Sequence, residues 1–117
     1  MTEGELGLLT LAAKAAGLEV FRGPSGSHQY DYWSMYRKNP KGDFYNGIEW
    51  NPLSDDGDAL RLAIDLELDV SLGKNGAVVE FGKLQIEELD ASDPYDAVRR
   101  AIVRAAAAIG ENMEFKL

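Results

Sequence analysis

The sequence predicts an α+β fold, in which three helices pack on a largely antiparallel sheet to form a three-layer α-β-α sandwich. Three segments carry apolar residues at helical spacing, over residues 5–16, 55–66 and 94–109. Between them, short segments alternate apolar and polar residues and are separated by turn residues, as in strands joined by hairpins. Each helix needs a surface on which to bury its apolar face, so we expect helices on both faces of one sheet.

The composition limits the class of protein. A chain of 117 residues with 45% apolar side chains and mixed charge is large enough for one core, so residues 1–117 are expected to form a single domain. The absence of cysteine excludes disulfides and cysteine-based metal sites. Residues 1–5 are acidic and lack the basic region of a signal peptide, and no apolar run reaches the ~18 residues of a membrane span. We therefore expect a cytoplasmic protein that makes no membrane contact.

The first helix is expected over residues 5–16, with a broad apolar stripe along one side. Thr2 and Glu5 stand three residues apart, which is the spacing of a capping box at a helix start. Gly17 follows at a position where helices commonly end in the left-handed conformation. The alanines of the stripe are small, so we expect this helix to approach a sheet closely.

The region from residue 18 to residue 50 is rich in aromatic side chains and alternates like a set of strands. We expect strands over residues 18–22, 29–36 and 44–50, with loop or turn residues over 23–27 and 37–42. The pair at 46–47, Asn-Gly, can equally make a tight turn inside the third strand. Tyr30, Tyr32 and Tyr36 fall on one face of the second strand, because side chains alternate along a strand. If that face is exposed, it is a surface for contact with a partner. The simpler explanation is burial under helices on both faces of the sheet.

The stretch that begins at Trp50 separates the aromatic half of the chain from the second helix. Pro52 restricts the preceding residue to extended conformations, so no helix can continue through this point. Ser54 or Asp55 can then cap a helix that runs to Leu66, and Trp50 can fasten this helix to the sheet. The apolar face of the helix consists of one row and the residues beside it: Leu60, Ile64 and Leu68, with Ala59, Ala63 and Leu66.

The second half of the chain has the clearest hairpin and helix signals. Strands are expected over residues 69–72, 77–81 and 83–89, the first two joined by the turn at 73–76. Asp93 caps the third helix and Pro94 takes its first position. Gly110 is expected to end this helix, and the alternating residues 113–117 to add an edge strand or to fray. Because such a strand can pair across a two-fold axis, a homo-oligomer is one expectation.

Arg99 and Arg100, near the start of the third helix, are the leading candidates for ligand-binding residues. Together with Trp50 they would bind a small anionic ligand such as a nucleotide, because guanidinium groups recognise phosphate and carboxylate. The simpler explanation is that they pair with neighbouring acids, since Asp96 and Arg100 are four residues apart on the helix.

Other chemistries find little support in the sequence. The acidic run at 55–58 lacks the spacing of a calcium loop and is explained by helix capping, so no metal site is expected. His28 is the only histidine and no serine motif of the G-x-S-x-G type accompanies it, so no catalytic residue is assigned and an enzyme is not expected. No motif for a cofactor occurs. The net charge of −8 argues against direct contact with nucleic acid, which needs a concentrated basic face.

Two stretches of the chain resemble a known protein family. The first joins residues 50–53 (Trp-Asn-Pro-Leu) to residues 55–63, and the second joins residues 93–95 (Asp-Pro-Tyr) to residues 97–105. Together with residues 11–18, they resemble the phage ABA sandwich domain family of small tailed-phage proteins. The resemblance implies a three-layer α-β-α sandwich and a phage or prophage origin. It supplies no catalytic or binding residues that can be transferred to this chain.

We therefore expect a phage-encoded accessory protein of the host cytoplasm that acts by binding and performs no chemistry. The leading expected partner is a host protein, which the acidic balance and the aromatic segment favour. The alternatives are the small anionic ligand described above and a role as a minor component of the virion or of its assembly.

Overall fold

The computed structural model describes residues 1–24, 33–43, 47–89 and 91–114. Within these residues the chain forms three helices and two three-stranded antiparallel sheets, which confirms the α+β class. In chain order the elements are α1 (Glu3–Ala16), β1 (Val20–Pro24), β2 (Trp33–Arg37), β3 (Ile48–Glu49), α2 (Asp56–Asp65), β4 (Asp69–Leu72), β5 (Ala77–Phe81), β6 (Leu84–Glu88) and α3 (Pro94–Glu114).

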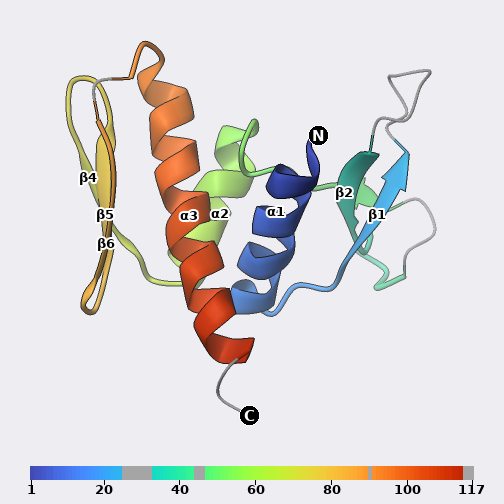
Figure 1. The fold of residues 1–117 in the computed structure, drawn as a ribbon. Coiled ribbons are helices and arrows are strands. Elements are labelled where there is room, and N and C mark those ends of the chain that lie inside the picture. Colours follow the sequence, from blue (N-terminus) through green and yellow to red (C-terminus); the bar gives the residue numbers. More distant parts are fainter. Residues whose placement is uncertain (25–32, 44–46, 90, 115–117) are drawn as a thin grey trace.

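The helices lie between the two sheets (Figure 1). α3 packs along α1 on one side and on β5 and β6 on the other, while α1 contacts β2. The expected layering, with one sheet between helices, is therefore not confirmed. The physical reason lies in the small residues of α1 and α3. Ala12 and Ala13 of α1 and Ala105 and Ala106 of α3 are almost fully buried, so these helices bury their apolar faces largely against each other.

α1 has the two ends that the sequence predicts. Thr2 Oγ1 accepts a hydrogen bond from the Glu5 backbone N–H at 3.1 Å, and Glu5 Oε1 accepts one from the Thr2 backbone N–H at 2.9 Å. The hydrogen bond from the Thr2 backbone is the main reason why the pKa of Glu5 is lowered. Gly17 then ends the helix with a φ of 71°, in the left-handed region.

The first sheet, β1-β2-β3, occupies the aromatic half of the chain. Residues 23–24 are predicted as a loop, but both belong to β1 and lie opposite residues 33–34 of β2. Glycine at position 23 allows the Tyr36 ring to lie close to the β1 backbone, because a Cβ there would be 3.1 Å from that ring. The remaining predicted strand positions at 29–32 and 44–46 lie outside the described residues.

The second sheet, β4-β5-β6, and the start of α2 agree with the sequence. β4 and β5 form the predicted hairpin, with Leu72 opposite Ala77, and β6 returns along β5. Asp55 caps α2, because its side chain accepts a hydrogen bond from the Asp58 backbone N–H at 2.8 Å. From the start of α2 to the end of β6, the chain therefore has the elements that its turns and caps predict.

α3 is longer than predicted, because it passes through Gly110 and ends at Glu114. The prediction that Gly110 ends the helix is wrong. A Cβ at this position would lie 2.0 Å from the Leu11 carbonyl oxygen, so the glycine allows the backbones of α1 and α3 to approach each other. The predicted edge strand is also wrong at residues 113–114, which are helical, and residues 115–117 lie outside the described residues.

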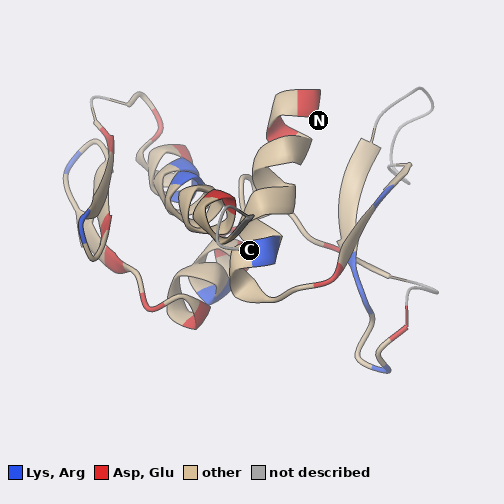
Figure 2. Cartoon of the chain, turned by 60° about the horizontal axis from the view of Figure 1, so that its bottom comes forward, with Lys and Arg blue, Asp and Glu red and all other residues tan. Residues whose placement is uncertain are grey.

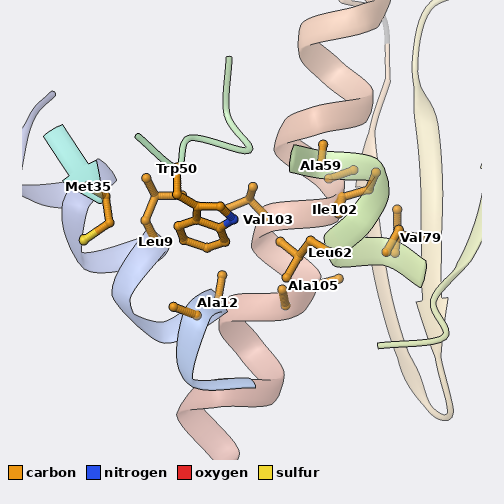
Figure 3. Close-up of a cluster of buried hydrophobic side chains, with 14 of the residues drawn as sticks. Leu9, Ala12, Met35, Trp50, Ala59, Leu62, Val79, Ile102, Val103 and Ala105 are labelled. Carbon is orange, nitrogen blue, oxygen red and sulfur yellow. The ribbon is translucent and has the colours of Figure 1, made fainter. Parts of the chain in front are cut away.

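Trp50 lies at the centre of the core, with 3% of its surface exposed. Figure 3 shows its ring between Leu9 of α1 and Val103 of α3, with Met35 of β2 on the side of Leu9. The Trp50 backbone N–H also donates to the Met35 carbonyl at 2.8 Å. Trp50 therefore joins the first sheet to α1 and α3, whereas the sequence predicts that it fastens the second helix to the sheet.

Candidate functional site

The three residues predicted to bind an anionic ligand lie in different surroundings, and one of them is the tryptophan in the core. Arg99 Nε donates to the Leu53 carbonyl at 2.9 Å, and Arg99 Nη1 pairs with Asp56 Oδ1 at 2.6 Å. Arg100 Nη2 pairs with Asp96 Oδ2 at 2.5 Å, as the i, i+4 spacing predicts. The two guanidinium groups therefore make the structural contacts of the simpler explanation, and the three residues do not line one common site.

Of the three tyrosines predicted as an interaction surface, Tyr36 belongs to the described residues, whereas Tyr30 and Tyr32 lie outside them. The Tyr36 ring stacks on Phe21 of β1, with the ring centroids 5.5 Å apart. Its hydroxyl donates to the Pro24 carbonyl at 2.7 Å. These contacts hold β2 against β1, so Tyr36 supports the first sheet.

A groove of about 560 Å³ lies between α2, β4 and the first half of α3, and we name it the α2–β4 groove. Its volume is within the range of about 300–1,000 Å³ that is typical of ligand pockets. Apolar side chains make up most of its lining. The lining residues are Asp56, Ala59, Leu60, Ala63, Val70, Leu72, Gly73, Pro94, Tyr95, Val98, Arg99 and Ile102.

The groove exists because α3 covers only part of the second sheet. α3 packs on β5 and β6, and it covers Ala77 and Val79 of β5, which are 1% and 0% exposed. Leu72 and Val70 of β4 are the cross-strand partners of these two residues and share their face of the sheet. Leu72 is nevertheless 72% exposed, because no described helix packs closely over β4. The inner face of β4 therefore forms one open wall of the groove.

α2 forms the opposite wall and presents apolar side chains to the surface. It buries Ala59, Leu62 and Ala63 in the core. Leu60 and Ile64, which the sequence assigns to the apolar face of this helix, are 59% and 62% exposed. The face of α2 that the sequence predicts to be buried is therefore only partly buried. The helix meets α3 through its small alanines and Leu62 instead. Leu60 lines the groove and Ile64 lies one turn further along α2.

The segment that forms two walls of the groove is strongly acidic. Residues 55–72 carry six acidic side chains and one basic one, Arg61. Arg61 is bound to Asp58 at 2.9 Å and lies 3.8 Å from Asp55. The hydrogen bond to the Asp58 carboxylate is the main reason why the pKa of Arg61 is raised. Figure 2 shows acidic positions on α2 and on its connection to β4.

The chemistry of the lining suits the burial of apolar side chains. Its ionisable groups are Asp56 and Arg99, which pair with each other, and the phenol of Tyr95. Tyr95 is 70% exposed, so its ring is available at the rim of the groove. Sequence reasoning missed this site. The signal that could have found it is the pair Val70 and Leu72, which add apolar surface on a sheet face that one helix cannot fully cover.

Comparisons of the chain with protein-family models, with curated proteins and with solved structures found no match. In the described part of the chain, no helix is long and apolar enough to cross a membrane. The same residues contain no group of side chains placed to hold a metal ion. The geometry and charge of the α2–β4 groove are therefore the features from which a function can be argued.

Proposed function

We propose that this protein is a non-catalytic binding module and that it contacts a protein partner through the α2–β4 groove. One observation carries the proposal: three large apolar side chains that are more than half exposed line this groove, and a fourth lies one helical turn away on α2. Leu60, Leu72 and Tyr95 line it, and Ile64 extends the patch along α2. Contiguous exposed apolar surface around a hollow is typical of protein contact sites.

The groove favours a protein over the small anionic ligand that the sequence also suggests. Arg99 is the single basic residue in the lining, and two of its nitrogens already donate to the Leu53 carbonyl and to Asp56. A phosphate or carboxylate would have to displace these contacts and would lie beside the Asp56 carboxylate. We therefore rank a nucleotide or a similar anion second.

The setting of this interaction is argued from the sequence, and its phage origin from the family resemblance. We propose a phage or prophage origin, a cytoplasmic location in the host cell and a host protein as the partner. The acidic charge of the chain supports a partner with a basic contact surface, because complementary charges speed encounter and favour the correct partner. A minor virion or assembly component is a further alternative, and finding the protein in purified particles would favour it.

The proposal is tested by comparing the binding partners of matched variants. Leu60→Ser combined with Leu72→Ser removes two exposed groove side chains, and Leu89→Ser removes a side chain that is 55% exposed outside the groove. All three side chains are exposed, so we expect the variants to fold like the wild type. Each protein is used as bait in a bacterial lysate, and the bound proteins are quantified by mass spectrometry.

We expect one protein to be enriched by the wild type and by Leu89→Ser, and to fall at least tenfold with the double variant. This loss follows because interface energy is concentrated in a few well-packed apolar anchors. Equal recovery by all three proteins would show that the contact lies elsewhere and would overturn the proposed role of the groove.

A further inference from the structure

We infer that the partner segment that occupies the α2–β4 groove is a basic amphipathic helix. The inference rests on the proposed function, because it specifies what kind of protein segment the groove binds. It is carried by two independent features of the described residues: the part of the second sheet that α3 leaves uncovered, and the charge of the segment that forms the walls.

The second sheet has an apolar face that α3 covers only in part. Val70 and Leu72 of β4 continue the apolar face that Val79 and Ala77 of β5 bury under α3. Helices that share a sheet face lie about 8–10 Å apart. α2 does not occupy the position over β4 beside α3. It packs on α3 instead and leaves the groove between itself and β4. A helix from a partner, lying over β4 beside α3, would complete the helical layer on this face.

The side chains that face the groove favour a helix over a strand as its occupant. A strand that joined the sheet would bond to the backbone along the outer edge of β4, beside the sheet. It would leave the side chains of Leu72 and Leu60, which face the groove, uncovered. A helix with apolar residues at spacings of three and four would instead place its side chains between these two walls.

The walls of the groove belong to an acidic segment. Residues 55–72 carry six acidic side chains and one basic one, of which Asp56 is bound to Arg99 and Asp58 to Arg61. The acids Asp65, Glu67 and Asp69 are exposed where α2 continues into β4, outside the lining of the groove. Lys or Arg residues on the flanks of a helix in the groove would therefore meet a negative surface. A second copy of this chain would bring the same acidic segment against itself, so charge disfavours self-association through the groove.

The inference is tested with synthetic probes of defined composition. The probe is a fluorescein-labelled 18-residue peptide with Leu at helical spacing and Lys and Gln at the other positions. A second peptide carries Glu in place of each Lys, and a third carries the Lys peptide's residues in scrambled order. Fluorescence anisotropy measures their affinities for the wild type, for Leu60→Ser with Leu72→Ser, and for Leu89→Ser, at low and moderate salt.

We expect the Lys peptide to bind at least tenfold more tightly than the Glu peptide and the scrambled peptide. Its affinity should fall at least tenfold in the double groove variant, remain unchanged in Leu89→Ser and weaken as salt increases. Asp65→Asn combined with Glu67→Gln neutralises two exposed acids between α2 and β4 and should weaken binding of the Lys peptide about threefold.

Each contrary outcome has a defined meaning. Equal binding of the Lys and Glu peptides, or no binding of either, overturns the basic helix, but groove-dependent capture of a protein from lysate would still support the proposed function. Binding that is insensitive to the double groove variant also overturns the inference, because the peptide then binds elsewhere. Self-association that light scattering detects and that the double groove variant abolishes would identify a second copy as the occupant.

Discussion

Glu67 is a residue in an unfavourable conformation. Its φ of 55° places it in the left-handed region, and it is the one non-glycine residue in the described part of the chain with a positive φ. It follows the C-cap Leu66 of α2, where many helices have glycine. The Leu68 N–H donates to the Ala63 carbonyl at 2.9 Å and the Glu67 N–H to the Ile64 carbonyl at 3.1 Å, which is the bonding pattern of a Schellman motif. The motif is complete, but its left-handed position holds a side chain.

We expect Glu67→Gly to stabilise the protein by about 0.5–1 kcal/mol. The left-handed conformation costs a non-glycine residue about 1–2 kcal/mol, and glycine removes this cost. The greater conformational freedom of glycine in the unfolded chain offsets only part of the gain in stability. Glu67→Gln is the matched control, because it removes the charge and keeps the Cβ. Urea unfolding measures both. A glycine variant less stable than the glutamine variant would mean that the conformation at Glu67 carries no net strain.

At the scale of the elements, the sequence predicts best what depends on neighbouring residues. The capping box of Thr2 and Glu5 and the start of α3 at Pro94 are local signals, and both are found where expected. Gly110 shows where local signals fail. Its position after an apolar stripe is that of a helix stop, but its neighbour in space is the backbone of Leu11, which is remote in sequence. A single sequence does not reveal which backbone a glycine approaches.

We expect Gly110→Ala to destabilise the protein by about 1–3 kcal/mol, as overpacking does in a filled core. The new Cβ would lie 2.0 Å from the Leu11 carbonyl oxygen and 2.8 Å from the Leu11 carbonyl carbon, so the α1 and α3 backbones would have to separate. Because the changed contact joins two backbones, we expect the effect at the upper end of this range.

Gly7→Ala in α1 is the matched control, because a Cβ there would meet nothing within 4 Å. Helix propensity alone favours alanine over glycine by about 1 kcal/mol, so Gly7→Ala should stabilise the protein. The two variants make the same chemical change in a helix and are predicted to shift the urea midpoint in opposite directions. A midpoint that rises in both variants would contradict the close approach of α1 and α3 at Gly110.

The same limit applies to the candidate site. The sequence identifies the apolar residues of α2, but it does not determine which side of the helix meets the core. Ala59 and Ala63 are buried, whereas Leu60 and Ile64, at neighbouring positions, are exposed. Arg99 is recognisable as a residue of interest, but its bonds to Leu53 and Asp56 depend on how α2 and α3 are placed in the fold. The groove therefore depends on tertiary packing that periodicity alone does not specify.

At the scale of the whole molecule, the question is whether the two sheets and the helices between them unfold together. The first sheet has few contacts with the helices besides those of α1 with β2. Trp50 strengthens this connection, since it packs with Leu9 and Val103 and bonds through its backbone to Met35. Burial of one large aromatic ring across several elements makes it costly to detach the sheet from the helices.

We expect the molecule to unfold in one cooperative transition, which can be followed with a single tryptophan. Trp33 is 46% exposed, so Trp33→Phe should change stability by less than about 0.5 kcal/mol and leave Trp50 as the sole indole reporter. In this variant the urea transitions measured by Trp50 fluorescence and by far-ultraviolet circular dichroism should coincide, as two-state unfolding requires. A fluorescence transition at lower urea than the loss of helix would show that the first sheet separates before the helices unfold. Because Trp50 lies where the sheet meets α1 and α3, its environment would change as soon as that contact opened, so the two curves distinguish one unit from two.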